Sequence, residues 1–473
     1  MPSGSARRGP PRAVWQPAPA KVNLGLVVTG RRADGYHLLL TLYHTLELRD
    51  WVLVEAEPFS CDCRSSFPGD ASWEVPGYGS AGATIDVSWD VRPGRHGISA
   101  CQLVGVGHSS GAGTGCPGNE RTGMGTGAGT RAELMRLCLG MDLVPTGRDN
   151  LACRAVSRFT ELARPGARAG VPGLPGGSAG SSGDSAGMNL AVRALVKTIP
   201  AGAGLGGGSA DAAAALRGAA LLTAARAGGT MESGYETAED GRPAYRSPAW
   251  ETVAGAAPVK EAAASLGADV PFAVAGGAAL AMGTGERFAC LPALDWPVVV
   301  VKPSFGLATA EVFRWYDQDR GGENGRVAQR EAAEKRDAIL SLAQVLATTG
   351  EDRRREQLAR HITTWGRELP NDLAPVVYAR FPELSAWRER LAASSALLYG
   401  MTGSGSALFA LADGEPGLAR LWDELAREHG APGPALILAS RLTPGWPAIG
   451  LTALPGGSIV GMNRLGRGND PRC

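Results

Sequence analysis

Residues 198–215 read T-I-P-A-G-A-G-L-G-G-G-S-A-D-A-A-A-A, with five glycines between positions 202 and 208. A strand-like run at 190–199 precedes this loop, and Ser209 is expected to open an alanine-rich helix. Glycine adopts backbone angles denied to other residues and leaves room for an anion to approach the amides. The helix adds unpaired N–H groups and the positive end of its dipole. The stretch therefore predicts a phosphate-binding loop.

Two better-known phosphate loops do not fit this stretch. Gly202, Gly204 and Gly207 match G-x-G-x-x-G, but that pattern requires an acidic residue closing a second strand ~20 residues on. The residues at that distance read R-A-G-G-T-M-E, which is not a strand pattern. The Walker pattern requires a lysine before Ser or Thr, and this loop has no lysine. A triphosphate would be held by amides, Ser209 and cations from elsewhere, and an ordinary glycine-rich turn is the alternative in a chain with 67 glycines.

Composition limits the class of protein. A chain of 473 residues that is 44% hydrophobic can form two or three domains with sizeable cores. The formal net charge of +1 argues against nucleic acid as a partner. The eight cysteines form no C-x-x-C framework, so zinc is not expected and a reduced cytosolic setting fits best. With no membrane-spanning run and no signal-peptide pattern, a cytoplasmic location is expected, or a plastid if the source is a plastid-bearing eukaryote.

Patterned blocks alternate with low-complexity stretches along the chain. Strands are expected at 22–28, within 41–56 and at 296–303, and a helix is expected at 149–162 with Asp149 or Asn150 as its cap. Stretches rich in Gly, Ser and Pro at about 59–130, 165–187 and 228–248 are predicted to be insertions. The first of them contains a strand-like run at 83–91.

Asp269 follows a helix that is expected to end at Gly267, and Pro271 and an apolar, glycine-punctuated strand are expected after it. This place is as typical of a local cap as of a catalytic carboxylate. Lys21 lies beside a strand start, where a lysine is usually solvated. A second Gly/Ser loop at 401–411 either lines the first loop or only turns the chain.

Six motifs occur in one order: P-A-K-V-N-L-G-L, D-G-Y-H, D-N-L, P-A-G-A-G-L-G-G-G-S, L-G-A-D-V-P-F and M-T-G-S-G-S-A. Together they resemble the 4-diphosphocytidyl-2-C-methyl-D-erythritol kinases of the GHMP kinase superfamily. The glycine loop marks the superfamily, whereas P-A-K-x-N-L and D-G-Y-H carry the narrower assignment. The resemblance implies an α+β fold of two domains: a ribosomal-protein-S5-domain-2-like ATP-binding domain at 14–290 and an α/β sandwich domain at 291–455. Residues 1–13 and 456–473 are expected to be disordered tails.

The resemblance also implies an activity and a site. Such kinases use ATP and Mg²⁺ to phosphorylate the 2-hydroxyl of 4-diphosphocytidyl-2-C-methyl-D-erythritol in the non-mevalonate route to isoprenoids. Asp269 would be the catalytic base and Lys21 its cationic partner. Asn23, Tyr36 and His37 would lie at the cytosine of the substrate, and Phe313 would supply a second aromatic face. The implied ATP-binding residues are Asn150, Pro200, Ala201, Gly202, Ala203, Gly204, Leu205, Gly206, Gly207, Gly208 and Ser209.

Position 210 is alanine and position 211 is aspartate where relatives often have Ser and Asn, so no magnesium ligand is assigned. A small-molecule substrate, no nucleic-acid or membrane partner, and a monomer or homodimer are expected.

The chemistry of phosphoryl transfer agrees with Asp269 as the base and Lys21 as its cationic partner. The hydroxyl must be held in line, its proton accepted and the phosphate charge compensated. A carboxylate can take the proton, and a neighbouring ammonium keeps that carboxylate ionised. Two alternatives remain: another GHMP kinase, of the homoserine or mevalonate type, and a nucleotide-binding protein without catalysis. Lys21 and D-G-Y-H argue against a homoserine or mevalonate kinase. The intact Lys21 and Asp269 argue against a nucleotide-binding protein without catalysis, although the insertions leave that alternative open.

Overall fold

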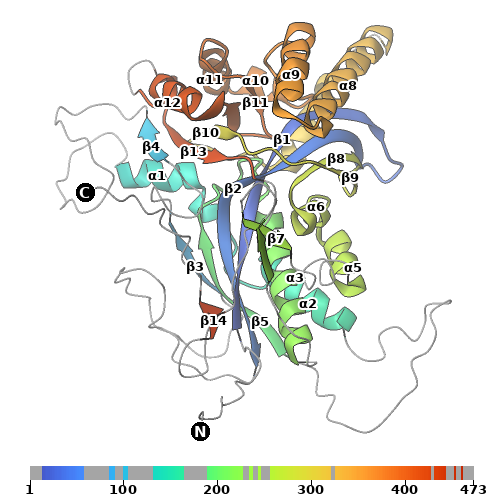
Figure 1. Cartoon of the computed structure of the whole chain (residues 1–473), viewed down its shortest axis with the longest axis vertical. Coiled ribbons are helices and arrows are strands. Elements are labelled where there is room, and N and C mark those ends of the chain that lie inside the picture. Colours follow the sequence, from blue (N-terminus) through green and yellow to red (C-terminus); the bar gives the residue numbers. More distant parts are fainter. Residues whose placement is uncertain are drawn as a thin grey trace.

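The computed structural model describes residues 13–57, 85–90, 100–104, 131–163, 189–226, 234–237, 243–246, 256–320, 325–427, 431–443, 452–453 and 460–461. Most of the predicted insertions and of the two predicted tails lies outside these residues. The described part forms two main sheets, each with helices packed on it (Figure 1).

The first sheet is built on two long antiparallel strands, β1 (Ala13–Arg31) and β2 (His37–Glu57). The other strands are β3 (Asp86–Trp89), β5 (Asn189–Lys197), β8 (Ala278–Gly283) and β9 (Arg287–Leu291). The order is β3-β5-β2-β8-β9, with β1 paired to β2. The strands predicted at 22–28, within 41–56 and at 190–199 are confirmed. β1 and β2 run further than predicted because each satisfies the backbone hydrogen bonds of the other along its length.

Four helices belong to this first part: α2 (Leu151–Ala163), α3 (Gly207–Arg226), α5 (Ala257–Leu266) and α6 (Val270–Ala275). α3 contacts β1, β2 and α2, and Figure 1 shows α2 and α3 side by side along the strands. Its alanines at 212–215 are fully buried. The small side chains let α3 lie close to the sheet, since a Cβ added at Gly218 would come 2.7 Å from a methyl of Val54. The alanine-rich sequence is therefore a packing surface.

The second sheet has the order β11-β12-β10-β13-β4. Its strands are β10 (Pro297–Pro303), β11 (Leu398–Met401), β12 (Leu408–Leu411), β13 (Ala435–Arg441) and β4 (Ala100–Val104). All residues from Val298 to Val301 on the central strand β10 are fully buried, which confirms the strand predicted there. A continuous apolar run of this kind is typical of a strand covered on both faces.

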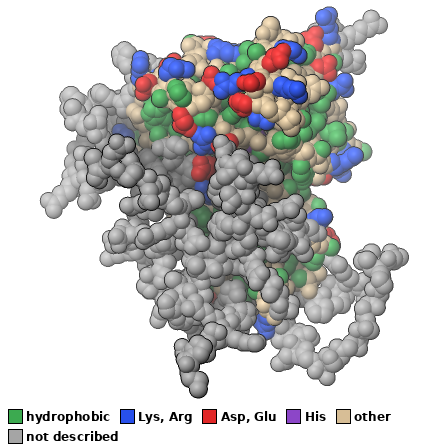
Figure 2. Space-filling view, viewed as in Figure 1, with side chains coloured by type: hydrophobic (Ala, Val, Ile, Leu, Met, Phe, Trp, Pro, Cys, Tyr) green, Lys and Arg blue, Asp and Glu red, His purple; other side chains and the backbone are tan. Residues whose placement is uncertain are grey.

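The helices of this second part are α7 (Thr309–Arg320), α8 (Gly325–Ala347), α9 (Glu351–Trp365), α10 (Ala374–Arg380), α11 (Pro382–Ala392) and α12 (Gly414–Leu425). α8 also contacts β1 and β2, so it packs against both parts of the molecule. Figure 2 shows Lys and Arg intermixed with Asp and Glu over the helices of this part. On α9, Arg355 pairs with Glu351 and Arg360 with Glu356, which places both signs of charge together.

The stretch at about 59–130, predicted to be an insertion, contributes a strand to each sheet. β3 pairs in parallel with β5, and β4 pairs with β13 at the edge of the second sheet. α1 (Arg131–Leu139) and the 3-10 turn η2 (Met141–Leu143) follow directly. β3 lies within the strand-like run predicted at 83–91, so that strand prediction is confirmed. β4 was not predicted, because its short apolar run lies among glycine-rich neighbours.

Two short hairpins complete the described part. β6 (Gly234–Thr237) pairs with β7 (Pro243–Arg246) inside the stretch predicted as the third insertion. β14 (Thr452–Ala453) pairs with β15 (Val460–Gly461), which lies within the predicted C-terminal tail. At the other end, Ala13 already belongs to β1, so the predicted N-terminal tail is one residue too long.

Two local predictions were wrong. α3 begins at Gly207, so Ser209 lies inside its first turn and does not open it. The positive φ of Gly206 (71°) redirects the chain into the helix earlier than a serine cap would. After Asp269 the chain forms the short helix α6 before reaching β8, where a strand was expected. Pro271 is at the start of that helix, a position that proline favours. The predicted end of α5 at Gly267 is confirmed.

His44 on β2 is fully buried and gives the fold a predictable response to acid. Its Nδ1 lies 2.9 Å from the carbonyl of Thr45, and its Nε2 accepts a hydrogen bond of 2.8 Å from the Leu294 amide. Burial lowers the pKa of His44 to about 4. The unfolded chain therefore binds a proton between about pH 6.5 and pH 4 that the folded chain does not.

We expect acidification from pH 7 to 4.5 to cost the wild type about 2.5 kcal/mol more unfolding free energy than His44→Gln, which has no ring to protonate. Urea unfolding of both proteins at the two pH values measures this difference. Equal acid sensitivity of the two proteins would show that His44 is not the responsible group.

Candidate active site

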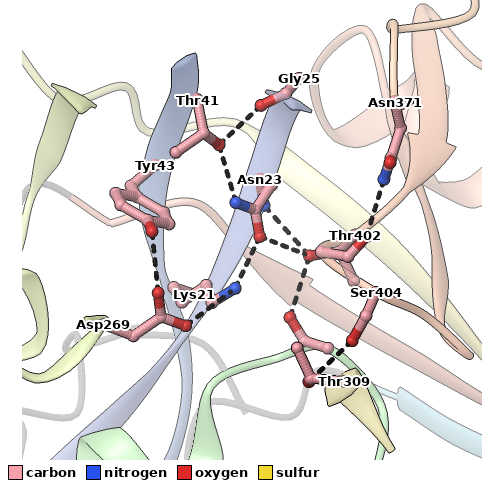
Figure 3. A network of polar contacts seen from close by, with 12 residues as sticks. Lys21, Asn23, Gly25, Thr41, Tyr43, Asp269, Thr309, Asn371, Thr402 and Ser404 are labelled. Atoms are coloured by element: carbon pink, nitrogen blue, oxygen red, sulfur yellow. Dashed lines mark hydrogen bonds and ion pairs between the residues drawn. The ribbon is translucent and has the colours of Figure 1, made fainter. Parts of the chain in front are cut away.

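The Lys21 ammonium and the Asp269 carboxylate meet where the first sheet faces the glycine loop. Lys21 Nζ lies 3.4 Å from Asp269 Oδ2 (Figure 3). Lys21 is on β1 beside a shift in its register with β2, and Asp269 immediately precedes α6. Irregular strand pairing of this kind re-aims side chains. The side chain of Lys21 is 9% exposed and that of Asp269 is 31% exposed, so an incoming molecule can reach the carboxylate.

Asn23 fixes the position of the Lys21 ammonium through a hydrogen bond. Lys21 Nζ donates to Asn23 Oδ1 at 2.6 Å, and Asn23 Nδ2 donates to Thr41 Oγ1 at 2.7 Å. The backbone N–H of Asn23 donates to Thr402 Oγ1 at 3.0 Å, which links β1 to the second Gly/Ser loop. The side chain of Asn23 is buried and both of its polar atoms are used within the protein. The structure thus places Asn23 beside the Lys21 ammonium.

The second Gly/Ser loop lines the first, which decides between the two alternatives for residues 401–411. Thr402 Oγ1 lies 3.2 Å from the Gly204 carbonyl, and the Ala407 amide donates to the Ala203 carbonyl at 3.1 Å. Asn371 Nδ2 donates to the carbonyls of Met401 and Gly403, both at 2.8 Å. Figure 3 shows Asn371, Thr402 and Lys21 in one connected network.

The glycines of the first loop have different structural roles. A Cβ at Gly204, whose φ is 74°, would come 2.2 Å from the Thr402 carbonyl oxygen. A Cβ at Gly206 would come 2.9 Å from Lys21 Cγ, so this glycine makes room for the lysine stem. A Cβ at Gly208 would meet nothing within 4 Å, so the space beside Gly208 is open. The opening lies at the first turn of α3, where helical N–H groups lack partners.

We expect Gly204→Ala to lower the unfolding free energy by at least about 2 kcal/mol, because it adds strain at positive φ to a backbone clash. Gly208→Ala is the matched control, and its effect should stay within about 1 kcal/mol because the added methyl meets open space inside a helix. Denaturant unfolding of the two variants measures the contrast. If Gly204→Ala is as stable as Gly208→Ala, the close approach of the two loops is wrong.

A buried charge cluster lies between the end of β5 and the start of α3, the two elements that the glycine loop joins. Lys197, at the end of β5, contacts the carboxylate of Asp50 on β2 and lies 2.7 Å from Asp211 Oδ2 on α3. Asp50 Oδ1 also accepts hydrogen bonds from the amides of Thr198 (2.6 Å) and Ile199 (2.8 Å). Burial alone would lower the pKa of Lys197, but the two carboxylates outweigh it and raise that pKa. Burial, with the Asp50 carboxylate, raises the pKa of Asp211.

The D-G-Y-H turn meets α7. His37 Nε2 lies 2.7 Å from Asp317 Oδ1, and the His37 ring stacks on Phe313 with centroids 4.6 Å apart. Tyr36 is 66% exposed. His37 and Phe313 stack on each other, so Phe313 does not face His37 across a gap. It supports the histidine instead.

Asn150 caps α2, as the sequence predicted. Its Oδ1 accepts from the Ala152 amide at 2.9 Å, and its Nδ2 donates to the Pro145 carbonyl at 2.8 Å. The neighbouring segment reaches the glycine loop, since the Ala201 amide donates to the Leu139 carbonyl at 2.8 Å. The contact with the loop is thus made at the end of α1, while the Asn150 side chain is committed to the start of α2.

Residues that the sequence analysis did not select complete the site. Tyr43 OH donates to Asp269 Oδ1 at 2.8 Å, and Thr402 joins the network around Asn23. Asp50 and Lys197 could have been noticed as charges within apolar, strand-like runs. Tyr43 has no such signal, because an aromatic residue in a strand is ordinary.

Known proteins resemble this chain in sequence. The family profile described as GHMP kinases C terminal matches residues 354–431. The 4-diphosphocytidyl-2-C-methyl-D-erythritol kinase of Moorella thermoacetica is 30% identical over 403 residues, which cover 84% of this chain and 90% of that protein. The chain belongs to this kinase family. The enzyme of the same name from Polaromonas sp. is 30% identical over 412 residues, 86% of each chain.

Solved structures extend the comparison to the fold. The crystal structure of homoserine kinase from Cytophaga hutchinsonii has a TM-score of 0.51 at 12% identity, and the match covers 94% of this chain and 98% of that one. It therefore shares the fold alone. The predicted α+β GHMP kinase fold and the predicted enzyme class, a kinase, are confirmed.

None of the described helices is long and apolar enough to cross a bilayer. Within the described residues, no group of three or more His, Cys, Asp and Glu side chains is placed to hold a metal ion.

Proposed function

We propose that this kinase transfers the γ-phosphoryl group of ATP to the 2-hydroxyl of 4-diphosphocytidyl-2-C-methyl-D-erythritol. The observation that carries the proposal is the Lys21–Asp269 pair beside the glycine loop, in a chain that is 30% identical over 403 residues to a kinase of that name. The same proposal includes a domain boundary near residue 290 and a cytoplasmic location. It also includes a monomer or homodimer that acts on a small molecule and has no nucleic-acid or membrane partner.

Asp269 acts as the base. The acceptor oxygen attacks the γ-phosphorus, its proton passes to the Asp269 carboxylate, and the bond to the β–γ bridging oxygen breaks to release ADP. The Lys21 ammonium faces this carboxylate and compensates charge on the phosphate that is transferred. The partial exposure of Asp269 gives the acceptor access, while the burial of Lys21 strengthens its interaction with both groups.

The glycine loop binds the phosphates. The first N–H groups of α3, at Gly207, Gly208 and Ser209, have no acceptor within the helix and carry the positive end of its dipole. The open space beside Gly208 lets phosphate oxygens approach them. Gly202, Ala203 and Gly204 are held against the second Gly/Ser loop. Leu205 and Gly206 lie against Lys21, so the direction of the amides at the start of α3 is fixed.

Mg²⁺ would enter with ATP. This ion is usually held by substrate phosphates and waters with only one or two protein oxygens, so it fits a site where the described residues form no carboxylate cage. When bound it would compensate charge on the phosphates. No protein ligand is assigned to it.

Tyr36 and His37 are proposed to bind the cytosine. The exposed ring of Tyr36 is free to stack on a base, and His37, held by Asp317 and Phe313, presents a fixed polar edge. Asn23 contributes by holding Lys21, and Asn150 by holding the segment that contacts the glycine loop on the proposed adenine side.

An assay of ATP consumption with a panel of acceptors tests the proposal. We expect turnover with 4-diphosphocytidyl-2-C-methyl-D-erythritol and none with homoserine or mevalonate. Turnover with another alcohol would keep the mechanism but overturn the substrate and the roles of Tyr36 and His37. ATP binding without turnover on any acceptor would overturn the proposed function and favour a nucleotide-binding protein.

A further inference from the structure

Tyr43 contacts one carboxylate oxygen of the proposed base, and Lys21 faces the other. Its hydroxyl donates a 2.8 Å hydrogen bond to Asp269 Oδ1, while Lys21 lies 3.4 Å from Oδ2 (Figure 3). Tyr43 is 2% exposed, and its ring stacks on Phe272 with centroids 4.7 Å apart. Phe272 in turn meets the edge of Phe288 at 6.1 Å. The hydroxyl is therefore held by a packed aromatic cluster on strands and a helix.

The turn between β8 and β9 is shaped around this hydroxyl. A Cβ added at Gly285, whose φ is 120°, would come 2.5 Å from the Tyr43 oxygen. Any other residue at that position would thus be strained and would push the hydroxyl away from Asp269. Lys21 Nζ also lies 5.5 Å from the centroid of the Tyr43 ring, within the range of a cation–π contact. The phenol, the ammonium and the carboxylate form one compact group.

The phenol remains a donor throughout the pH range of an enzyme assay. Burial raises the pKa of Tyr43 well above its usual value, and the carboxylates of Asp269 and Glu286 raise it further. The charged groups that face this pair are Lys21 on β1 and Glu286 in the β8–β9 turn. Glu286 is itself held by the amide of Thr284 at 2.6 Å and by its hydroxyl at 2.8 Å.

We propose that Tyr43 is a positioning residue that fixes the Asp269 carboxylate and leaves Oδ2 to take the proton of the acceptor. The hydroxyl occupies Oδ1, whereas the 3.4 Å separation from Lys21 is longer than a charge-assisted hydrogen bond and leaves Oδ2 able to accept another. A donated hydrogen bond also favours the ionised form of a carboxylate. The inference rests on the proposed role of Asp269 as base.

Tyr43→Phe tests this role, because it removes the hydroxyl and keeps the ring on Phe272. We expect kcat to fall about 10-fold with KM for ATP unchanged within twofold, as expected for an interaction that matters at the reacting centre. Phe288→Leu is the control: it loosens the same cluster but keeps the hydroxyl on Asp269, so it should keep wild-type kcat.

A second measurement reads the contact without any substrate. The carboxyl ¹³C signal of Asp269, assigned with Asp269→Asn, should move in Tyr43→Phe at neutral pH and stay in place in Phe288→Leu, because only the first variant removes the donated hydrogen bond. If no acceptor is phosphorylated, the proposed function fails while this signal still decides the Tyr43 contact. A Tyr43→Phe enzyme with wild-type kcat, or an unchanged signal, would overturn the inference. So would a Phe288→Leu enzyme with the same loss of kcat as Tyr43→Phe.

Discussion

Asp269→Asn should lower kcat about 10²–10⁴-fold, the range that a positioned general base contributes. The amide has the shape of the carboxylate but cannot accept the proton of the acceptor hydroxyl. It also removes the charge that Lys21 faces at 3.4 Å. The glycine loop that is proposed to bind ATP is untouched, so the affinity for ATP should change little. In energy, the loss corresponds to about 3–5 kcal/mol of transition-state stabilisation.

Steady-state kinetics with ATP and the acceptor measure this loss, and nucleotide binding is followed separately. Asp413→Asn is the matched control, since Asp413 is exposed before α12 and makes no side-chain cap there. The control should keep wild-type kcat. An Asp269→Asn enzyme whose kcat stays within threefold of wild type would show that the proton goes elsewhere and that the base is wrongly assigned.

The second large effect concerns stability. Lys197→Met should lower the unfolding free energy by about 3–5 kcal/mol, because it leaves buried carboxylates without their cation. Asp50 and Asp211 are both nearly inaccessible to water, so solvent cannot replace the ammonium. Their mutual repulsion would also disturb the end of β5 and the start of α3, the two elements that the glycine loop joins. Denaturant unfolding measures the loss.

Two further variants separate the charge from the packing. Asp211→Asn keeps the contact between Lys197 and Asp50, so its cost should be clearly smaller. Replacing all three residues together, as Lys197→Met with Asp50→Asn and Asp211→Asn, should recover part of the loss because no unpaired charge stays buried. A Lys197→Met protein as stable as the wild type would mean that the cluster does not hold the loop.

The glycine loop could be predicted from sequence because its signals are local. Glycine spacing, the strand before it and the alanines after it all act within about twenty residues, and the structure confirms this order of elements. The start of α3 was misplaced by two residues because serine is a common cap, whereas here the positive φ of Gly206 turns the chain. The local sequence pattern therefore predicted the helix α3 but not the residue at which it begins.

The site depends on contacts between distant parts of the chain, and there the sequence is less informative. Lys21 and Asp269 were selected by resemblance to a family, and only the structure shows that they meet. Tyr43 could not be selected because its role depends on the turn at Gly285 and on Phe272, both far away in sequence. β4 was hidden by the glycine-rich residues around it, although it completes the second sheet.

The identity of the product tests the central claim most directly. Purified protein would be incubated with ATP and 4-diphosphocytidyl-2-C-methyl-D-erythritol, and the product examined by ³¹P NMR with correlation to the carbon skeleton. We expect one new phosphate on the 2-hydroxyl for each ADP formed, and none with Asp269→Asn. A phosphate at another hydroxyl, or no product from protein that still binds ATP, would contradict the proposed function.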